Sequence, residues 1–235
     1  MGCVETMDKK ELTKLISALV MSDGGVYYSG KNCRYVRNQL AKHWDYLSWI
    51  RDVLSNVTTT TITKVNDNRE GRKSSLRVMS RTHPMFNDIR ERFYVGNYKS
   101  IDPHFLKMFD WQCAAILYMD DGHLRTDPRS PNYFTCDLST KRLSYGDSLL
   151  LKKTIKDKLD VEFNVRKDSR GYYYLTLRRK DAEKFLKGVY PYTFASFKYK
   201  FTYPDGKPVT DFNSGGGDIV RPSWQHEDSE RNLAA

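Results

Sequence analysis

Two copies of one short pattern constrain the fold of this chain most strongly. An apolar stretch with helical spacing ends in Asp23-Gly24, and a second one ends in Asp121-Gly122, 98 residues later. Tyr98-Lys99 and Tyr199-Lys200 follow these aspartates at similar distances, with the lysines 76 and 79 residues after the acids. An internal duplication of about 95 residues explains the matched positions, so we expect two similar halves in one chain.

Each half shows the same predicted order of elements, α-β-β-α-β-β-α. Apolar residues at three- and four-residue steps predict helices, and runs rich in Thr, Val, Arg and Tyr predict strands. The predicted helices cover 9–22, 44–54, 84–93, 111–120, 146–159 and 181–189. The predicted strands cover 25–28, 34–38, 58–65, 76–82, 123–125, 133–138, 161–166 and 172–178. The sequence therefore predicts an α+β fold made of tandem repeats.

The repeats are predicted to cover residues 8–99 and 110–202, with 100–109 as the linker. The segments 66–72 and 167–171 carry the Asn, Asp and Gly residues typical of hairpin turns. Residues 203–235 are polar and contain a Gly-rich run, which predicts a flexible tail. The apolar run 114–119 is far shorter than the roughly 20 residues of a bilayer crossing, so we expect no membrane partner.

Charge and cysteine usage narrow the function classes. The 235-residue chain has a net charge of +10, while the segment 203–235 carries about −3, which leaves about +13 on the rest. That charge favours a polyanionic partner, nucleic acid before an acidic membrane surface, although a merely soluble basic protein stays open. The four cysteines form no C-x-x-C pair, which indicates an intracellular, reducing compartment such as the cytoplasm or an organelle matrix.

Two acids lie where a carboxylate is unfavourable. Leu12, Leu15 and Leu19 mark a buried helical stripe that Asp23 continues, and Asp121 continues the matching stripe four residues after Leu117. Burial and the negative end of the helix dipole both disfavour a carboxylate there. A positive group must offset this cost.

The two helices carry small residues on or beside their stripes, namely Ser17, Ala18, Ala114 and Ala115. If these helices pack together, the two aspartates converge near a pseudo-twofold axis, and their like charges raise each other's pKa unless cations lie between them. Hard divalent cations, Mg²⁺ foremost, meet that need. The alternative is that each Asp-Gly pair only ends its helix, with the glycine as the left-handed residue of the cap. The occurrence of two Asp-Gly pairs at matched positions favours the metal site.

Residues 16–24 and 114–122 resemble the LAGLIDADG motif. The first matches it at Leu19, Asp23 and Gly24, and the second at Ala115, Leu117, Asp121 and Gly122. Together with the element order and the basic body, the resemblance covers residues 8–202. The chain resembles a single-chain, two-repeat LAGLIDADG homing endonuclease.

This resemblance implies a monomer with a pseudo-twofold saddle of two antiparallel sheets and a central two-helix interface on double-stranded DNA. It implies a metal-dependent double-strand cut in which Asp23 and Asp121 are the catalytic acids, and Lys99 and Lys200 approach the scissile phosphates. Mg²⁺, or Mn²⁺ or Ca²⁺ in its place, would lie at Asp23 and Asp121. Gly24 and Asp120 belong to the same predicted metal site, Asp120 as a supporting or capping carboxylate.

We expect DNA to be recognised by every second residue of the strands, because these side chains share one face of each sheet. Together the two sheets would contact roughly 20 base pairs. The candidates are Arg34, Arg37, Lys64, Arg77, Arg81, Arg125, Arg166, Arg170, Tyr174 and Arg178. A slip of one residue in register would invert this list.

Other function classes stay open from the sequence. They are an intron maturase that binds intron RNA, a non-cleaving DNA-binding regulator, and an acidic-substrate enzyme or scaffold. The five histidines are scattered without an i, i+4 pair, which argues against a His-based metal nuclease.

Overall fold

The computed structural model describes residues 7–65, 73–127 and 129–212, and the predicted turn 66–72 lies outside them. The first half contains α1 (Lys9–Met21), β1 (Gly25–Ser29), β2 (Asn32–Leu40), the 3-10 helix η1 (Ala41–His43), α2 (Trp44–Ser55), β3 (Thr60–Val65), β4 (Ser75–Ser80) and α3 (Pro84–Phe93). The second contains α5 (Trp111–Asp121), β7 (Gly122–Asp127), β8 (Ser130–Ser139), α6 (Tyr145–Leu159), β9 (Asn164–Lys167), β10 (Tyr173–Leu177) and α7 (Arg179–Val189), followed by the 3-10 helices η2 (Tyr190–Tyr192) and η3 (Ala195–Phe201). The α-β-β-α-β-β-α order is confirmed.

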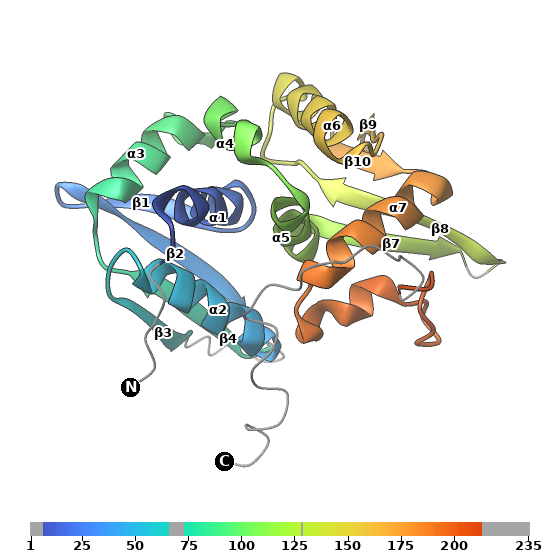
Figure 1. The fold of residues 1–235 in the computed structure, drawn as a ribbon, viewed down its shortest axis with the longest axis horizontal. Helices are drawn as coiled ribbons and strands as arrows, with labels where there is room; N and C mark the ends of the chain where they lie inside the picture. Colours follow the sequence, from blue (N-terminus) through green and yellow to red (C-terminus); the bar gives the residue numbers. More distant parts are fainter. Residues whose placement is uncertain (1–6, 66–72, 128, 213–235) are drawn as a thin grey trace, which may run out of the picture.

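Each half forms one antiparallel four-stranded sheet, and the two sheets share one topology. Their strand orders are β1-β2-β4-β3 and β7-β8-β10-β9. Helices α2 and α3 pack on the first sheet, α6 and α7 pack on the second, and α1 packs against α5. Figure 1 shows the two halves side by side, with α1 and α5 between the sheets. The predicted α+β fold with a central two-helix interface is confirmed.

Strand parity sorts side chains between the two faces of each sheet. In β2, Cys33, Tyr35 and Arg37 are buried, and in β8, Phe134, Cys136 and Leu138 are buried 101 residues further on. These residues face the helices, because β-strand side chains alternate and the intervening positions are more exposed. The two sheets therefore present matching outward faces.

The connection between the halves is more structured than a linker. A short hairpin joins β5 (Tyr94–Val95) to β6 (Tyr98–Lys99), and helix α4 (Pro103–Met108) follows it. The Asp102 carboxylate caps α4 by accepting a 2.9 Å hydrogen bond from the His104 backbone N–H. Two-residue strands and a six-residue helix are too short for sequence periodicity to predict.

The first ten residues of the predicted flexible tail pack against the second repeat. Val209 is buried, and the Phe212 ring stacks on Tyr190 with centroids 4.1 Å apart. These apolar residues are too widely spaced to form a periodic pattern, yet they pack on the second repeat. Residues 213–235 lie outside the described part of the chain.

The cysteines among the described residues form no disulfide bond. Cys33, Cys113 and Cys136 are buried free thiols, while Cys3 is outside the described residues. None of the helices in the described ranges combines the length and apolar character that a bilayer crossing demands.

Candidate nuclease site

The two acids stand at the ends of the paired helices. Asp121 is the last residue of α5, and Asp23 follows the cap residue Ser22 of α1. The Asp23 side chain is 38% exposed, and Asp121 is partly buried. The two matched acids are therefore not in identical environments.

The glycine after each acid is required by close packing. A Cβ at Gly24 would lie 2.4 Å from both the Leu19 carbonyl oxygen and the Tyr35 hydroxyl, and one at Gly122 would lie 2.1 Å from the Tyr118 ring. Neither glycine has a positive φ. The left-handed helix cap that the sequence left open is therefore wrong.

The acids act on each other electrostatically. The pKa of Asp121 is raised to about 7, mainly by burial and then by the negative charges of Asp23 and Asp120, against the opposing charges of Arg142 and Lys99. A charge from the first repeat that perturbs an acid of the second requires the helix ends to lie close together.

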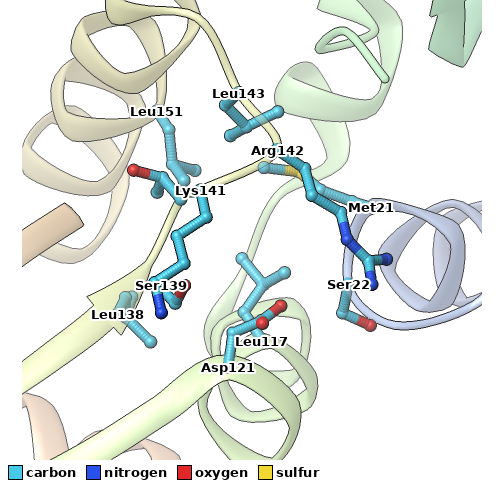
Figure 2. A pocket seen from close by; sticks show the side chains of 11 residues that line it. Met21, Ser22, Leu117, Asp121, Leu138, Ser139, Lys141, Arg142, Leu143 and Leu151 are labelled. Carbon is cyan, nitrogen blue, oxygen red and sulfur yellow. The ribbon is translucent and has the colours of Figure 1, made fainter. Parts of the chain in front are cut away.

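A basic residue that the sequence reasoning missed lies between the repeats. The Arg142 Nη2 is 4.0 Å from Asp23 Oδ1, so the loop between β8 and α6 reaches the acid of the other repeat. This loop and the helix ends line a cavity of about 250 Å³. Figure 2 shows Asp121, Ser22 and Arg142 around it. The only sequence signal was the basic pair Lys141-Arg142, which resembles ordinary surface charge.

Lys99 is held at the end of α1. Its ammonium donates hydrogen bonds to the carbonyl oxygens of Val20, Ser22 and Gly24 at 2.7, 2.6 and 2.7 Å. Burial is the main reason that the pKa of Lys99 falls to about 8. The Gly24 carbonyl, a predicted metal ligand, is thus a hydrogen-bond acceptor for Lys99.

Lys200 makes the matching contacts at the end of α5. Its ammonium donates to the carbonyl oxygens of Tyr118, Met119 and Gly122 at 3.2, 2.7 and 2.8 Å, and burial lowers its pKa to about 8. An ammonium has three N–H groups, and each lysine uses all three on the helix end. Both lysines therefore fix the carbonyls beside the acids and place positive charge at the negative end of each helix.

Asp120 belongs to a buried ion pair. Its carboxylate accepts from both Nη atoms of Arg37, one at 2.8 Å, and from the Ser22 hydroxyl, and the Tyr46 hydroxyl lies 3.4 Å away. The side chains of Arg37 and Asp120 have no exposed surface. Both carboxylate oxygens accept from protein donors, so Asp120 is placed for the predicted supporting role and not for direct contact with a metal; that role stays a prediction.

Arg37 was predicted to contact DNA, and that prediction is also wrong. Its side chain lies on the buried, helix-facing side of β2. The matching position of β8, 101 residues later, is the buried Leu138. Pairing with Asp120 offsets the cost of burying its charge. A β-strand pattern alone did not reveal this partner, which lies 83 residues away in sequence.

The other predicted DNA contacts are spread over the strands and turns. Five of them lie on strands and point to the outward face: Arg34, Arg77, Arg125, Arg166 and Tyr174. Two more follow the strands β4 and β10 directly and are on the same side, Arg81 and Arg178. Arg170 lies exposed in the turn between β9 and β10. Lys64 pairs with Leu76 and has the parity of the helix-facing residues of its sheet, but it is exposed near the end of β3, so its DNA contact stays a prediction.

The donor set fits a hard divalent cation. Asp23 and Asp121 supply carboxylate oxygens, which Mg²⁺ prefers, and a cation beside them would offset the repulsion that raises the Asp121 pKa. Within the described ranges, no three His, Cys, Asp or Glu side chains gather as a metal site. Mg²⁺ is commonly bound by one or two carboxylates together with water and substrate phosphate.

Comparison with known proteins identifies the family. The sequence pattern of the LAGLIDADG DNA endonuclease family matches residues 7–185. The chain belongs to this family, and the predicted resemblance is confirmed.

Two curated relatives are RecA proteins. The chain is 25% identical over 198 residues to Protein RecA of Mycolicibacterium flavescens and 23% identical over 198 residues to that of Mycolicibacterium chitae. In each case the match covers 80% of this chain and 45% of the relative. The chain therefore spans less than half the length of these relatives.

Solved structures share the fold. The homing endonuclease I-WcaI bound to its DNA recognition sequence superposes with a TM-score of 0.70 at 17% identity, covering 83% of this chain and 87% of that one. The meganuclease I-SmaMI bound to uncleaveable DNA gives a TM-score of 0.51 at 11% identity, with coverage of 80% and 86%.

Proposed function

We propose that this protein is a site-specific homing endonuclease that makes a Mg²⁺-dependent double-strand break in a DNA target of about 20 base pairs. The observation that carries the proposal is the pair of acids, Asp23 and Asp121, at the ends of two packed helices. Family membership and the basic charge of the chain support it. The protein acts as a monomer in this proposal, because one chain holds both acids and both sheets.

Asp23 and Asp121 would hold Mg²⁺ against the scissile phosphates. The bound metal supplies water activation and stabilisation of the leaving 3′ oxygen. Lys99 and Lys200 keep the carbonyls beside the acids in place, and their charges lie where negative charge develops on the phosphate. Arg142 adds a third positive charge near Asp23.

The outward faces of the two sheets form the proposed DNA surface. Arginine side chains on strands are suited to reading guanine edges in the major groove, and those in turns are suited to phosphate contacts. The proposed contact residues are Arg34, Arg77, Arg81, Arg125, Arg166, Arg170, Tyr174 and Arg178.

A cleavage selection tests the function directly. The protein is incubated with a randomised duplex library and Mg²⁺, and the cut products are sequenced. We expect breaks in both strands within one preferred sequence, and EDTA should prevent them. Binding of a preferred sequence without any cleavage in Mg²⁺ would contradict the proposed activity.

Replacing Lys200 with methionine is expected to slow cleavage by about 100-fold and to change the DNA dissociation constant by only a few-fold. The change removes one positive charge beside the proposed position of the developing negative charge, for which losses of about 10²–10³ are typical. Single-turnover cleavage and DNA titration measure the two effects.

Lys198 is the matched control, because it lies on the same 3-10 helix η3 but is exposed. Lys198→Met should cleave at the wild-type rate. A folded Lys200→Met variant with wild-type cleavage would exclude the proposed role of Lys200.

A further inference from the structure

We propose that Arg125, held in place by Asp137, reads a guanine in the half of the target that the second repeat binds. This inference rests on the proposed DNA-cleaving function. It assigns base recognition to one arginine, and it assigns Asp137 the role of a positioning residue.

The register places both residues on the outward face of the second sheet. Arg125 pairs with Thr135, and Asp137 pairs with His123 on β7 and with Thr176 on β10. Leu124 and Cys136 point to the opposite, helix-covered face. Asp137 therefore lies in the middle of the surface proposed to meet DNA.

An acid at that position requires an explanation, because a carboxylate repels DNA phosphates. The Arg125 Nη2 donates to Asp137 Oδ2. The Asp137 side chain is only 9% exposed, whereas that of Arg125 is 60% exposed. The acid is thus covered, and the arginine extends from it towards solvent.

This arrangement leaves most of the guanidinium available. An arginine has five N–H groups in a planar fork, and a guanine accepts two of them through O6 and N7. Within the described part of the chain, Arg125 donates only to Asp137. The ion pair restricts the side chain before DNA arrives, which lowers the entropy lost on binding.

The first repeat has no equivalent pair. Tyr27 occupies the place of Arg125 in its sheet, and Val36 occupies the place of Asp137, since Gly25 pairs with Val36 as His123 pairs with Asp137. Neither side chain can form an ion pair. The inference therefore predicts that this ion-paired guanine contact is made only in the half-site that the second repeat binds.

The test selects bound sequences from a randomised duplex library in Ca²⁺ and then measures Mg²⁺-dependent cleavage of the best target and of its variants. The proteins compared are wild type, Arg125→Ala, Asp137→Asn, the double variant and Arg166→Ala, each checked for folding by circular dichroism. Wild type should prefer the guanine by about 5- to 150-fold, the usual range for one bidentate contact. Arg125→Ala should lose this preference, and Asp137→Asn should weaken it several-fold.

The double variant should match Arg125→Ala, because Asp137 acts only through Arg125. Arg166, on the outward face of β9, is the control, and its loss should change preference at a different base pair.

The inference is overturned if Arg125→Ala keeps every base preference, if wild type selects no guanine in that half-site, or if Asp137→Asn discriminates as wild type does. Selective binding without cleavage would instead contradict only the proposed nuclease activity.

Discussion

Asp121→Asn is expected to reduce DNA cleavage by at least about 1,000-fold while DNA binding stays within a few-fold of wild type. The substitution keeps the size of the side chain but removes the charge that we propose holds a divalent cation. Metal stabilisation of a phosphoryl transition state is worth several kcal/mol, and ~1.4 kcal/mol corresponds to tenfold in rate. Asp23→Asn should have the same effect, because each repeat supplies one acid.

Plasmid cleavage in Mg²⁺ and gel-shift titration in Ca²⁺ measure the two quantities. Asp157→Asn is the control, because Asp157 is an exposed acid of α6 that pairs with Lys153. It should cleave like wild type. Retained cleavage in either Asp23→Asn or Asp121→Asn would refute the assignment of that acid.

Arg37→Leu is expected to lower the free energy of unfolding by about 3–5 kcal/mol. Removing one partner of a buried ion pair leaves the other charge in an apolar interior without compensation, and losses of this size are typical. Here the stranded group is the Asp120 carboxylate, which has no exposed surface. Urea denaturation measures the change.

The second substitution Asp120→Ser should recover most of that stability. The double variant would carry leucine where β8 has Leu138, and serine where the first motif has Ser22, so both residues already occur at the matched positions. Lys153→Ala breaks an exposed pair and should cost no more than ~1 kcal/mol. Equal stability of wild type and Arg37→Leu would show that the buried pair is not needed.

The sequence alone was sufficient for the architecture and for the two acids. Hydrophobic stripes repeat at a fixed period along α1 and α5, and a duplication places the same pattern twice, so the element order and the position of Asp23 and Asp121 at two helix ends follow from local information. Lys99 and Lys200 were predicted from the family resemblance and from their similar distances to the acids, 76 and 79 residues. Their actual partners, the backbone carbonyls at the helix ends, leave no trace in side-chain patterns.

Only the tertiary structure decided which charged residues face the core, the site or the outward surface. Arg37 and Lys64 alternate with outward residues, and strand parity depends on a register that a single slip reverses. Three ion pairs join segments that meet only after folding: Arg37 with Asp120, Arg142 with Asp23, and Arg125 with Asp137. Local periodicity carries the information for secondary structure, whereas the burial of a charge depends on the group that packs against it.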